Sequence, residues 1–369
     1  MTVRVTKPEF NLREKLSEID KPVGVHGNDI LKSNSLEETC AIVGSGRKNL
    51  VINGNFDVWQ RGTAFNSFNS IRYTADRWLQ YAAGGSTITV TQQQFTVGQT
   101  EVPGNPRYYY RSDNTPDADT SWLELFHRIE DVTRFSDVPV TLSFWMKANK
   151  PQFGEDEVRL VQNFGTSGST KVTTQGPIFD ILTHWKKYEF TFDLPSVAGK
   201  TINANSFLEI HWIRVNTAVS SDTYYDIAQV QLEYGRGATP FEQRSYSEEL
   251  ALCQRYCVSY GGDDEVHLGT GHAYNSTNFN VSLHLPVPMR SKPSASRVNN
   301  GAGNWVQIYV GATGNQSDPS ITIGDAGGTV RDIHSIRMYL PSSHSGRTAG
   351  EAAWVHTLAD AKLILSAEI

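Results

Sequence analysis

One stretch decides the fold: Asn49-Leu-Val-Ile-Asn-Gly-Asn-Phe-Asp-Val-Trp-Gln-Arg-Gly62, followed closely by Tyr73-Thr-Ala-Asp-Arg-Trp78. The apolar run 50–52 predicts a buried strand, and Asn53-Gly54 predicts a tight turn. Phe56, Val58 and Trp59 then predict a second strand, which ends at Arg61-Gly62. We therefore expect a β-sandwich to begin here.

Strand signals continue at intervals of eight to fifteen residues as far as Arg244. Short apolar and aromatic runs separated by Gly, Pro and Asn are typical of a sandwich. The abundance of aromatic residues and glycine, with only four Met, also favours β-structure over a helical bundle. The predicted strands are 86–92, 107–111, 122–129, 140–147, 158–164, 187–192, 207–215 and 225–233.

Helical patterns flank this region. Leu12, Leu16 and Ile19 recur at helical spacing after a capping box at Thr6 and Glu9, which predicts an amphipathic helix over 1–20. Ser245 or Ser247 can cap a second helix, predicted over 245–258. The predicted organisation is therefore an N-terminal helix (1–20), an extended arm (21–48), a β-sandwich (49–244), a connecting helix (245–258) and a smaller β-sandwich-like domain (259–369).

Three stretches resemble one family. They are 1–16, the block 49–78, and Arg244-Ser-Tyr-Ser-Glu-Glu-Leu-Ala-Leu-Cys-Gln-Arg-Tyr256. Together they are similar to tail fibre and spike proteins of tailed bacteriophages, especially marine phages, which carry jelly rolls of the carbohydrate-binding-module type. The resemblance implies an external appendage of a virion, made in the host cytoplasm, assembled as a homotrimer and attached to other virion proteins through residues 1–48. It also implies that the β-sandwich over 49–244 is a jelly roll of this type, with a host-surface polysaccharide or lipopolysaccharide as ligand.

Charge and composition exclude other classes. The formal charge of −6 is spread along the chain, so the sequence predicts no nucleic-acid partner. No run approaches the length of about 18 apolar residues that a membrane span needs, and none at the N-terminus has the form of a secretory signal. Cys40, Cys253 and Cys257 are too few for a disulfide framework or a zinc site, and we expect the last two to be buried thiols on one helix face.

Alternation along the strands suggests a binding face. Leu142, Phe144 and Met146 share one side of their strand, as do Leu208, Ile210 and Trp212 of theirs, and we expect both sides to face the core. The opposite sides predict a sugar-binding outer face of one sheet, in which an aromatic ring covers the apolar face of a sugar. The alternative is that the tryptophan packs under a loop or against a neighbouring subunit. The candidate residues are Trp145, Lys147, Arg159, Asn163, Glu209 and His211.

The resemblance also implies a structural calcium ion where the first and last strands of the jelly roll meet. Asp226 looks like its acidic ligand, and Asn55 or Asp57 would complete the six to eight oxygens that calcium needs. Ile227-Ala-Gln229 replaces the second acidic position that is common in the family. Alternatively, Asp226 caps a strand end or accepts backbone N–H groups. No other cofactor is expected.

No common catalytic motif occurs, so we expect a protein that is not an enzyme. Glu124, Glu130, Asp131 and Glu209 could pair at the spacing of a glycosidase, and this leaves a polysaccharide depolymerase as one alternative. A second alternative is a purely architectural or decoration protein of the virion without sugar binding.

Overall fold

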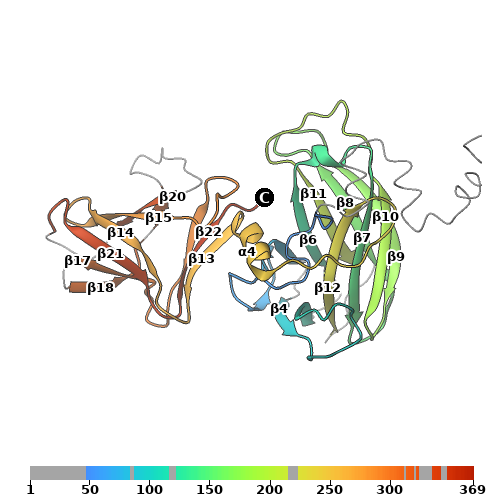
Figure 1. The fold of residues 1–369 in the computed structure, drawn as a ribbon, viewed down its shortest axis with the longest axis horizontal. Coiled ribbons are helices and arrows are strands. Elements are labelled where there is room, and N and C mark those ends of the chain that lie inside the picture. Colours follow the sequence, from blue (N-terminus) through green and yellow to red (C-terminus); the bar gives the residue numbers. More distant parts are fainter. Residues whose placement is uncertain are drawn as a thin grey trace, which may run out of the picture.

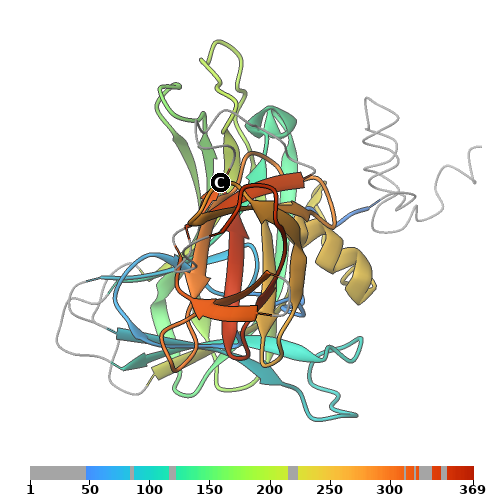
Figure 2. The same cartoon turned by 90° about the vertical axis from the view of Figure 1, so that its left-hand side faces the viewer.

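The computed structural model describes residues 47–83, 87–115, 122–214, 223–310, 313–319, 321–323, 335–341 and 347–369. The helix expected over 1–20 and nearly all of the arm expected over 21–48 lie outside these residues. Within them the chain is mainly β, in two β-units that one short helix connects (Figures 1 and 2). The expected fold class, a jelly roll followed by a smaller β-sandwich-like domain, is confirmed.

The first β-unit consists of two six-stranded antiparallel sheets. The first sheet has the order β1 (Ala64–Phe68), β4 (Thr87–Gln94), β5 (Tyr108–Thr115), β12 (Thr223–Tyr234), β7 (Pro139–Ala148), β10 (Lys186–Asp193). The second has the order β2 (Arg72–Tyr73), β3 (Trp78–Ala83), β6 (Trp122–Glu130), β11 (Phe207–Arg214), β8 (Gln152–Asn163), β9 (Val172–Ile181). A short 3₁₀ helix, η1 (Val132–Phe135), follows β6.

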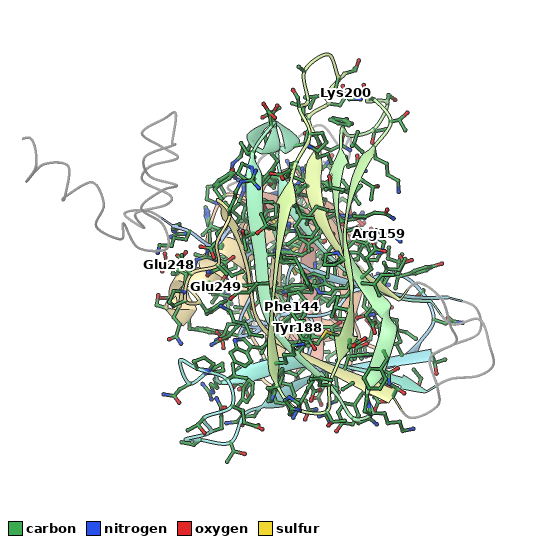
Figure 3. All side chains as sticks on the ribbon, turned by 90° about the vertical axis from the view of Figure 1, so that its right-hand side faces the viewer. Phe144, Arg159, Tyr188, Lys200, Glu248 and Glu249 are labelled. Atoms are coloured by element: carbon green, nitrogen blue, oxygen red, sulfur yellow. The ribbon has the colours of Figure 1, made fainter. Side chains whose placement is uncertain are left out.

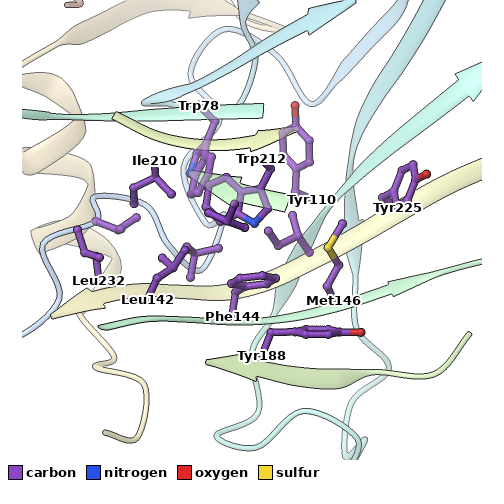
Figure 4. Packing of buried hydrophobic residues seen from close by; sticks show 14 of the residues in the cluster. Trp78, Tyr110, Leu142, Phe144, Met146, Tyr188, Ile210, Trp212, Tyr225 and Leu232 are labelled. Atoms are coloured by element: carbon purple, nitrogen blue, oxygen red, sulfur yellow. The ribbon is translucent and has the colours of Figure 1, made fainter. Parts of the chain in front are cut away.

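The core of this jelly roll lies between the two sheets (Figure 4). Leu142, Phe144 and Met146 of β7 enter it from the first sheet, and Leu208, Ile210 and Trp212 of β11 enter it from the second, as the alternation predicts. The Phe144 ring packs edge-on against Trp212, with the ring centroids 5.5 Å apart. Large aromatic groups of this kind bury much apolar area, which dominates the stability of a sandwich.

The stretch 49–62 forms irregular structure, so the strands predicted at 50–52 and 56–59 are wrong. The turn at Asn53-Gly54 is confirmed, because the N–H of Phe56 donates to the Asn53 carbonyl at 3.1 Å. The Asn53 side chain replaces a strand partner: its amide oxygen accepts the N–H of Val58 at 3.0 Å, and its nitrogen donates to the carbonyls of Val58 and Asp76. Phe56 and Val58 are nevertheless fully buried. The apolar pattern therefore reports burial here and not strand geometry.

Helix α4 (Tyr246–Gln254) connects the two β-units, and Ser245 caps it as predicted by accepting the N–H of Glu248. The helix ends before Cys257, which is the first residue of β13. The prediction of a helix as far as 258 is therefore wrong at its end, since the apolar residues 256–258 continue into a strand. Cys253 and Cys257 are both buried free thiols, although they do not share a helix face.

The second β-unit has one three-stranded and one seven-stranded sheet around its own core. The three-stranded sheet has the order β13 (Cys257–Gly262), β22 (Ala361–Ser366), β16 (Ser294–Val298). The seven-stranded sheet has the order β18 (Thr313–Ser317), β17 (Val306–Val310), β21 (Ala352–Thr357), β14 (His267–Ala273), β15 (Asn278–His284), β20 (Ser335–Pro341), β19 (Thr322–Ile323).

Charged pairs join the two β-units. The Glu368 carboxylate, just after β22, contacts Arg61 at 3.1 Å and also Arg77, which is almost fully buried. Arg77 lies over the ring of Tyr256 at 3.5 Å from its centroid. On the same joint Arg255 donates to Glu130 at 3.0 Å. The joint thus contains several contacts besides the covalent connection through α4.

Candidate functional site

A groove of about 450 Å³ lies on the outer face of the first sheet of the jelly roll. Its floor comes from adjacent strands: Ser143 and Trp145 from β7, Lys187 from β10 and Gln229 from β12. Its walls come from the loop at Pro103-Gly104 and from the segment 238–243, which follows β12. Residues from five separate parts of the sequence therefore meet at this groove.

Strand register explains why Trp145 lies on the floor. Phe144 and Met146 point into the core, so Trp145 points outward between its register partners Lys187 on β10 and Ala228 on β12. A β-bulge interrupts the pairing of β12 with β7 between Ala228 and Gln231, and Gln229 in this bulge has a φ of +49°. Such bulges locally redirect a side chain.

The walls of the groove are tied to its floor by hydrogen bonds. The side-chain amide of Gln229 donates to the carbonyl of Pro103 at 2.7 Å, and that of Gln243 donates to the carbonyl of Gly104. Gly104 has a φ of +79°, and a Cβ there would lie 2.8 Å from the Gln243 side chain. The close approach of these two walls therefore depends on a glycine.

Trp145 itself has two environments. It is half-buried and packs against a small apolar cluster of Phe95, Val102, Trp185 and Ala228. Its remaining surface lines the groove. The expected alternative, packing under a loop, therefore describes part of its surroundings, because Phe95 and Val102 come from the segment that connects β4 to β5.

Lys147 lies on the same face but contacts other groups. Its ammonium nitrogen is 3.9 Å from the Asp226 carboxylate and 5.0 Å from the centroid of the Trp185 ring. Asp226 is fully buried, and both of its oxygens accept from Arg111, at 2.7 and 2.9 Å. Burial raises the pKa of Asp226, while the bond from Arg111 opposes that rise. Asp226 therefore belongs to a buried ion pair.

The residues expected to bind calcium do not fit such a site. Arg111 occupies both oxygens of Asp226, and a guanidinium group repels a second cation. Asn55 donates instead to Asp57 at 3.0 Å. Among the residues that the structure describes, no group of three or more His, Cys, Asp or Glu side chains could hold a metal ion. The proposed calcium ligand set is therefore corrected to an Asp226–Arg111 ion pair and a separate Asn55–Asp57 contact.

Asp57 lines a second groove, of about 440 Å³, between the first sheet and the start of α4. Trp59, Tyr108 and the exposed Tyr246 supply aromatic walls, and Arg107 supplies a cation. Burial raises the pKa of Asp57, although its hydrogen bond with Asn55 opposes the rise. The sequence argument singled out Asp57 for a metal and missed this groove, because no local pattern links residues of β5 to α4.

The other four candidate residues lie on the second sheet, so the expectation that all six share one sheet is wrong. Figure 3 shows Arg159 apart from the Phe144–Tyr188 pair of the first sheet. Arg159 forms two hydrogen bonds with Glu157, and Asn163 accepts the N–H of Gly165. Glu209 accepts from Arg128 at 2.8 Å, and His211 stacks on Phe126. Alternation assigns the face of a strand and cannot assign its sheet.

The four acids considered for a glycosidase each have another partner. Glu209 is bound by Arg128, Glu124 lies 3.3 Å from His211, and Glu130 is bound by Arg255. Asp131 caps η1 by accepting the N–H of Thr133.

In the described part of the chain, no helix is both long and apolar enough to cross a membrane.

Comparison with known proteins gives likeness of fold alone. No family model matches the sequence, and no curated protein matches it. One similar solved structure is a putative sugar binding protein from Bacteroides thetaiotaomicron, at 16% identity and a TM-score of 0.33. The match covers 51% of this chain and 100% of the Bacteroides chain. Another is a family 11 carbohydrate-binding module from Clostridium thermocellum, at 10% identity, with 47% and 96% covered and a TM-score of 0.29.

A phage protein is also among the similar structures. It is the enzymatically active domain of tailspike protein 4 of bacteriophage CBA120, at 12% identity and a TM-score of 0.29, with 50% of this chain and 21% of that chain covered. The neighbours thus include carbohydrate-binding modules and one phage tailspike domain, all at low identity.

Proposed function

We propose that this chain is a structural protein of a phage virion, in a tail fibre, spike or related external appendage, and that it recognises host-surface polysaccharide or lipopolysaccharide. In this proposal it assembles as a homotrimer, attaches to other virion proteins through residues 1–48 and carries out no catalysis. The groove over Trp145 is the observation that supports sugar recognition.

The groove has the chemistry that a sugar needs. The part of the Trp145 indole that faces the groove can cover the C–H face of a pyranose ring, while Ser143, Gln229 and Lys187 around it can bond hydroxyl groups. Gln229 and Gln243 already hold the loop at Pro103-Gly104, so this wall is ordered before a ligand arrives. Preorganisation of this kind lowers the entropic cost of binding.

Three weak grooves on a trimer would bind a repetitive surface by avidity. Once one groove is occupied, the next binding event is intramolecular, and avidity can exceed the single-site affinity by about 10²-fold or more. A shallow groove with few charges is therefore sufficient for adsorption to a cell surface.

A glycan array with the full chain tests the proposal. Trp145→Ala should lower the signals of the glycans that this groove binds by about tenfold or more, which corresponds to about 1.4 kcal/mol. Phe153→Ala is the matched control, because Phe153 is an exposed aromatic residue of β8 on the second sheet. Retention of every signal by Trp145→Ala would remove this groove from the proposal.

The architectural alternative predicts a different result with the same variant. Trp145 already packs against an apolar cluster, and a neighbouring subunit seated on the groove would bury the remainder. Trp145→Ala would then weaken the oligomer in sedimentation, while the array gives no signal for either the parent or the variant.

The depolymerase alternative predicts a steady release of reducing sugar from host polysaccharide, whereas our proposal predicts a flat time course.

A further inference from the structure

The outer face of the seven-stranded sheet in the second β-unit carries a compact group of rings. Tyr309 of β17 and Trp354 of β21 are register partners, and their rings stack with centroids 4.1 Å apart and an interplanar angle of 10°. The ring centroid of His356 lies 5.3 Å from that of Trp354, and the ring centroid of His267 of β14 lies 6.2 Å from it. We call these four residues the Trp354 platform.

The platform lies outside the core. Ala353 and Val355 of β21 are core residues, so Trp354 points to the opposite face of the sheet, as Tyr309 does between Ile308 and Val310. Trp354 is 41% exposed, a large fraction for an indole. An aromatic ring that contacts water to this extent, on a strand whose other face is fully packed, is available to a ligand.

Gly314 explains how the stack is held. It is the register partner of Tyr309 on β18, and a Cβ there would lie 2.4 Å from the Tyr309 ring. The phenol ring therefore occupies the space that a side chain at position 314 would need, and Trp354 rests on that ring. One face of the indole is thus supported by Tyr309.

The other side of Trp354 borders small polar residues. Its register partner on β14 is Thr270, which is exposed. His272 of β14 and Ser282 of β15 are exposed on the same face. A rigid ring beside hydroxyl and imidazole groups is the arrangement that a pyranose requires, because the ring contacts its C–H groups and the polar side chains bond its hydroxyls.

We propose that the Trp354 platform is a second carbohydrate-contact site, which takes one pyranose ring independently of the groove over Trp145. A second copy of this chain is the other conceivable occupant. The core of such an interface would be mainly apolar, whereas Thr270, His272 and Ser282 around Trp354 are polar. The composition of the face therefore favours a sugar.

The test measures the full chain on an array of immobilised neutral hexose, N-acetylhexosamine and uronic acid oligosaccharides. On a Trp145→Ala background a subset of signals should remain, and adding Trp354→Ala should lower that subset by about tenfold or more. Trp354→Phe keeps a flat ring and should stay within about threefold of the Trp145→Ala protein. This separates the two sites, since loss of the groove alone leaves the platform intact.

A blocking variant distinguishes loss of sugar binding from loss of folding. Thr270→Arg places a long side chain beside the indole without removing any ring, so near-ultraviolet circular dichroism should be unchanged while the same subset of signals falls. The proposal is overturned if the Trp145→Ala protein gives no signal, or if adding Trp354→Ala leaves its signals unchanged. A smaller oligomer for Trp354→Ala in sedimentation would overturn it in favour of a second copy.

Discussion

The Glu249 carboxylate in α4 accepts the backbone N–H of Asn53 at 2.6 Å, across 196 positions of sequence. The same carboxylate contacts Arg244 at 3.2 Å, and Arg244 also donates to the carbonyls of Val51 and Asn49. The block that opens the jelly roll and the segment that follows its last strand are therefore one hydrogen-bonded unit. The contact thus joins two of the stretches on which the family resemblance rests.

Replacing Glu249 should destabilise the jelly roll. Burial raises the pKa of Glu249, and Glu249→Ala would remove one carboxylate partner of the buried Arg244 and the acceptor of the Asn53 N–H, at a cost of about 3 kcal/mol in urea unfolding. Glu248→Ala is the matched control: its side chain is more exposed and pairs with Arg47, so the change should stay within about 0.5 kcal/mol (Figure 3). Equal losses for both variants would contradict the role given to Glu249.

Two substitutions at Asn53 separate the contribution of its backbone conformation to stability from the contribution of its side-chain amide. Asn53 has a φ of +59°, which glycine adopts freely and alanine does not. Asn53→Ala should lower the free energy of unfolding by about 3 kcal/mol, because three buried hydrogen bonds are lost as well. Asn53→Gly should lose about 1 kcal/mol less. If both variants unfold at the same urea concentration, the backbone conformation contributes nothing measurable.

Asp76 should make stability depend on pH. Burial raises its pKa to about 7, although Arg61 opposes the rise. Between the ordinary value of about 4 and this value, the folded chain holds a proton that the unfolded chain has released. The contribution of Asp76 to the free energy of unfolding is therefore complete below about pH 4 and is lost as pH rises through 7.

Between pH 4 and pH 7 the free energy of unfolding of the parent should fall, and the Asp76→Asn variant should show a flatter profile. The control is Asp193→Asn, because Asp193 is an exposed carboxylate, 69% accessible at its side chain, paired with Arg236. Parallel profiles for the parent and Asp76→Asn would show that Asp76 does not cause the slope.

Calcium should have no effect on the thermal stability of the jelly roll. Arg111 already neutralises Asp226, so Tm should be the same in calcium and in a chelator. Asp226→Asn should instead lower the free energy of unfolding by about 3 kcal/mol, because Arg111 loses its partner. A rise in Tm with calcium that Asp226→Asn abolishes would restore the metal site.

Removing residues 1–20 should abolish incorporation into virus particles and leave both β-units folded. Residues 1–46 lie outside the described structure, whereas the two cores are built from residues 51–232 and 258–367. Particle-associated protein measured by immunoblot, beside circular dichroism of the purified variant, checks this. Normal incorporation of the shortened chain would refute the anchoring role.

Sequence periodicity predicted the strands that alternate most regularly. Phe144 and Ile210 were assigned to the core correctly, because a period of two specifies the face of a strand. The assignment of Trp145 and Glu209 to one sheet failed, since sheet membership is decided by which strands pair across distant positions. Strands rich in glycine or polar residues, such as β14 and β18, carried too little alternation to be predicted.

The candidate site was less predictable than the core. Trp145 was predicted from its outward position on β7. Gln229 and Gln243 were not predicted, because their place in the groove depends on the bulge in β12 and on hydrogen bonds to the loop between β4 and β5. The Trp354 platform also escaped prediction, since a cross-strand stack needs the register of β17 with β21. Local pattern contains no information about either pairing.

The ion pairs of Glu368 with Arg61 and Arg77 have a mechanical consequence. A pull on one β-unit relative to the other would be opposed by these pairs together with the Arg255–Glu130 contact, loaded in parallel, instead of by the backbone of α4 alone. Under flow this joint would therefore yield less readily than one made of α4 alone.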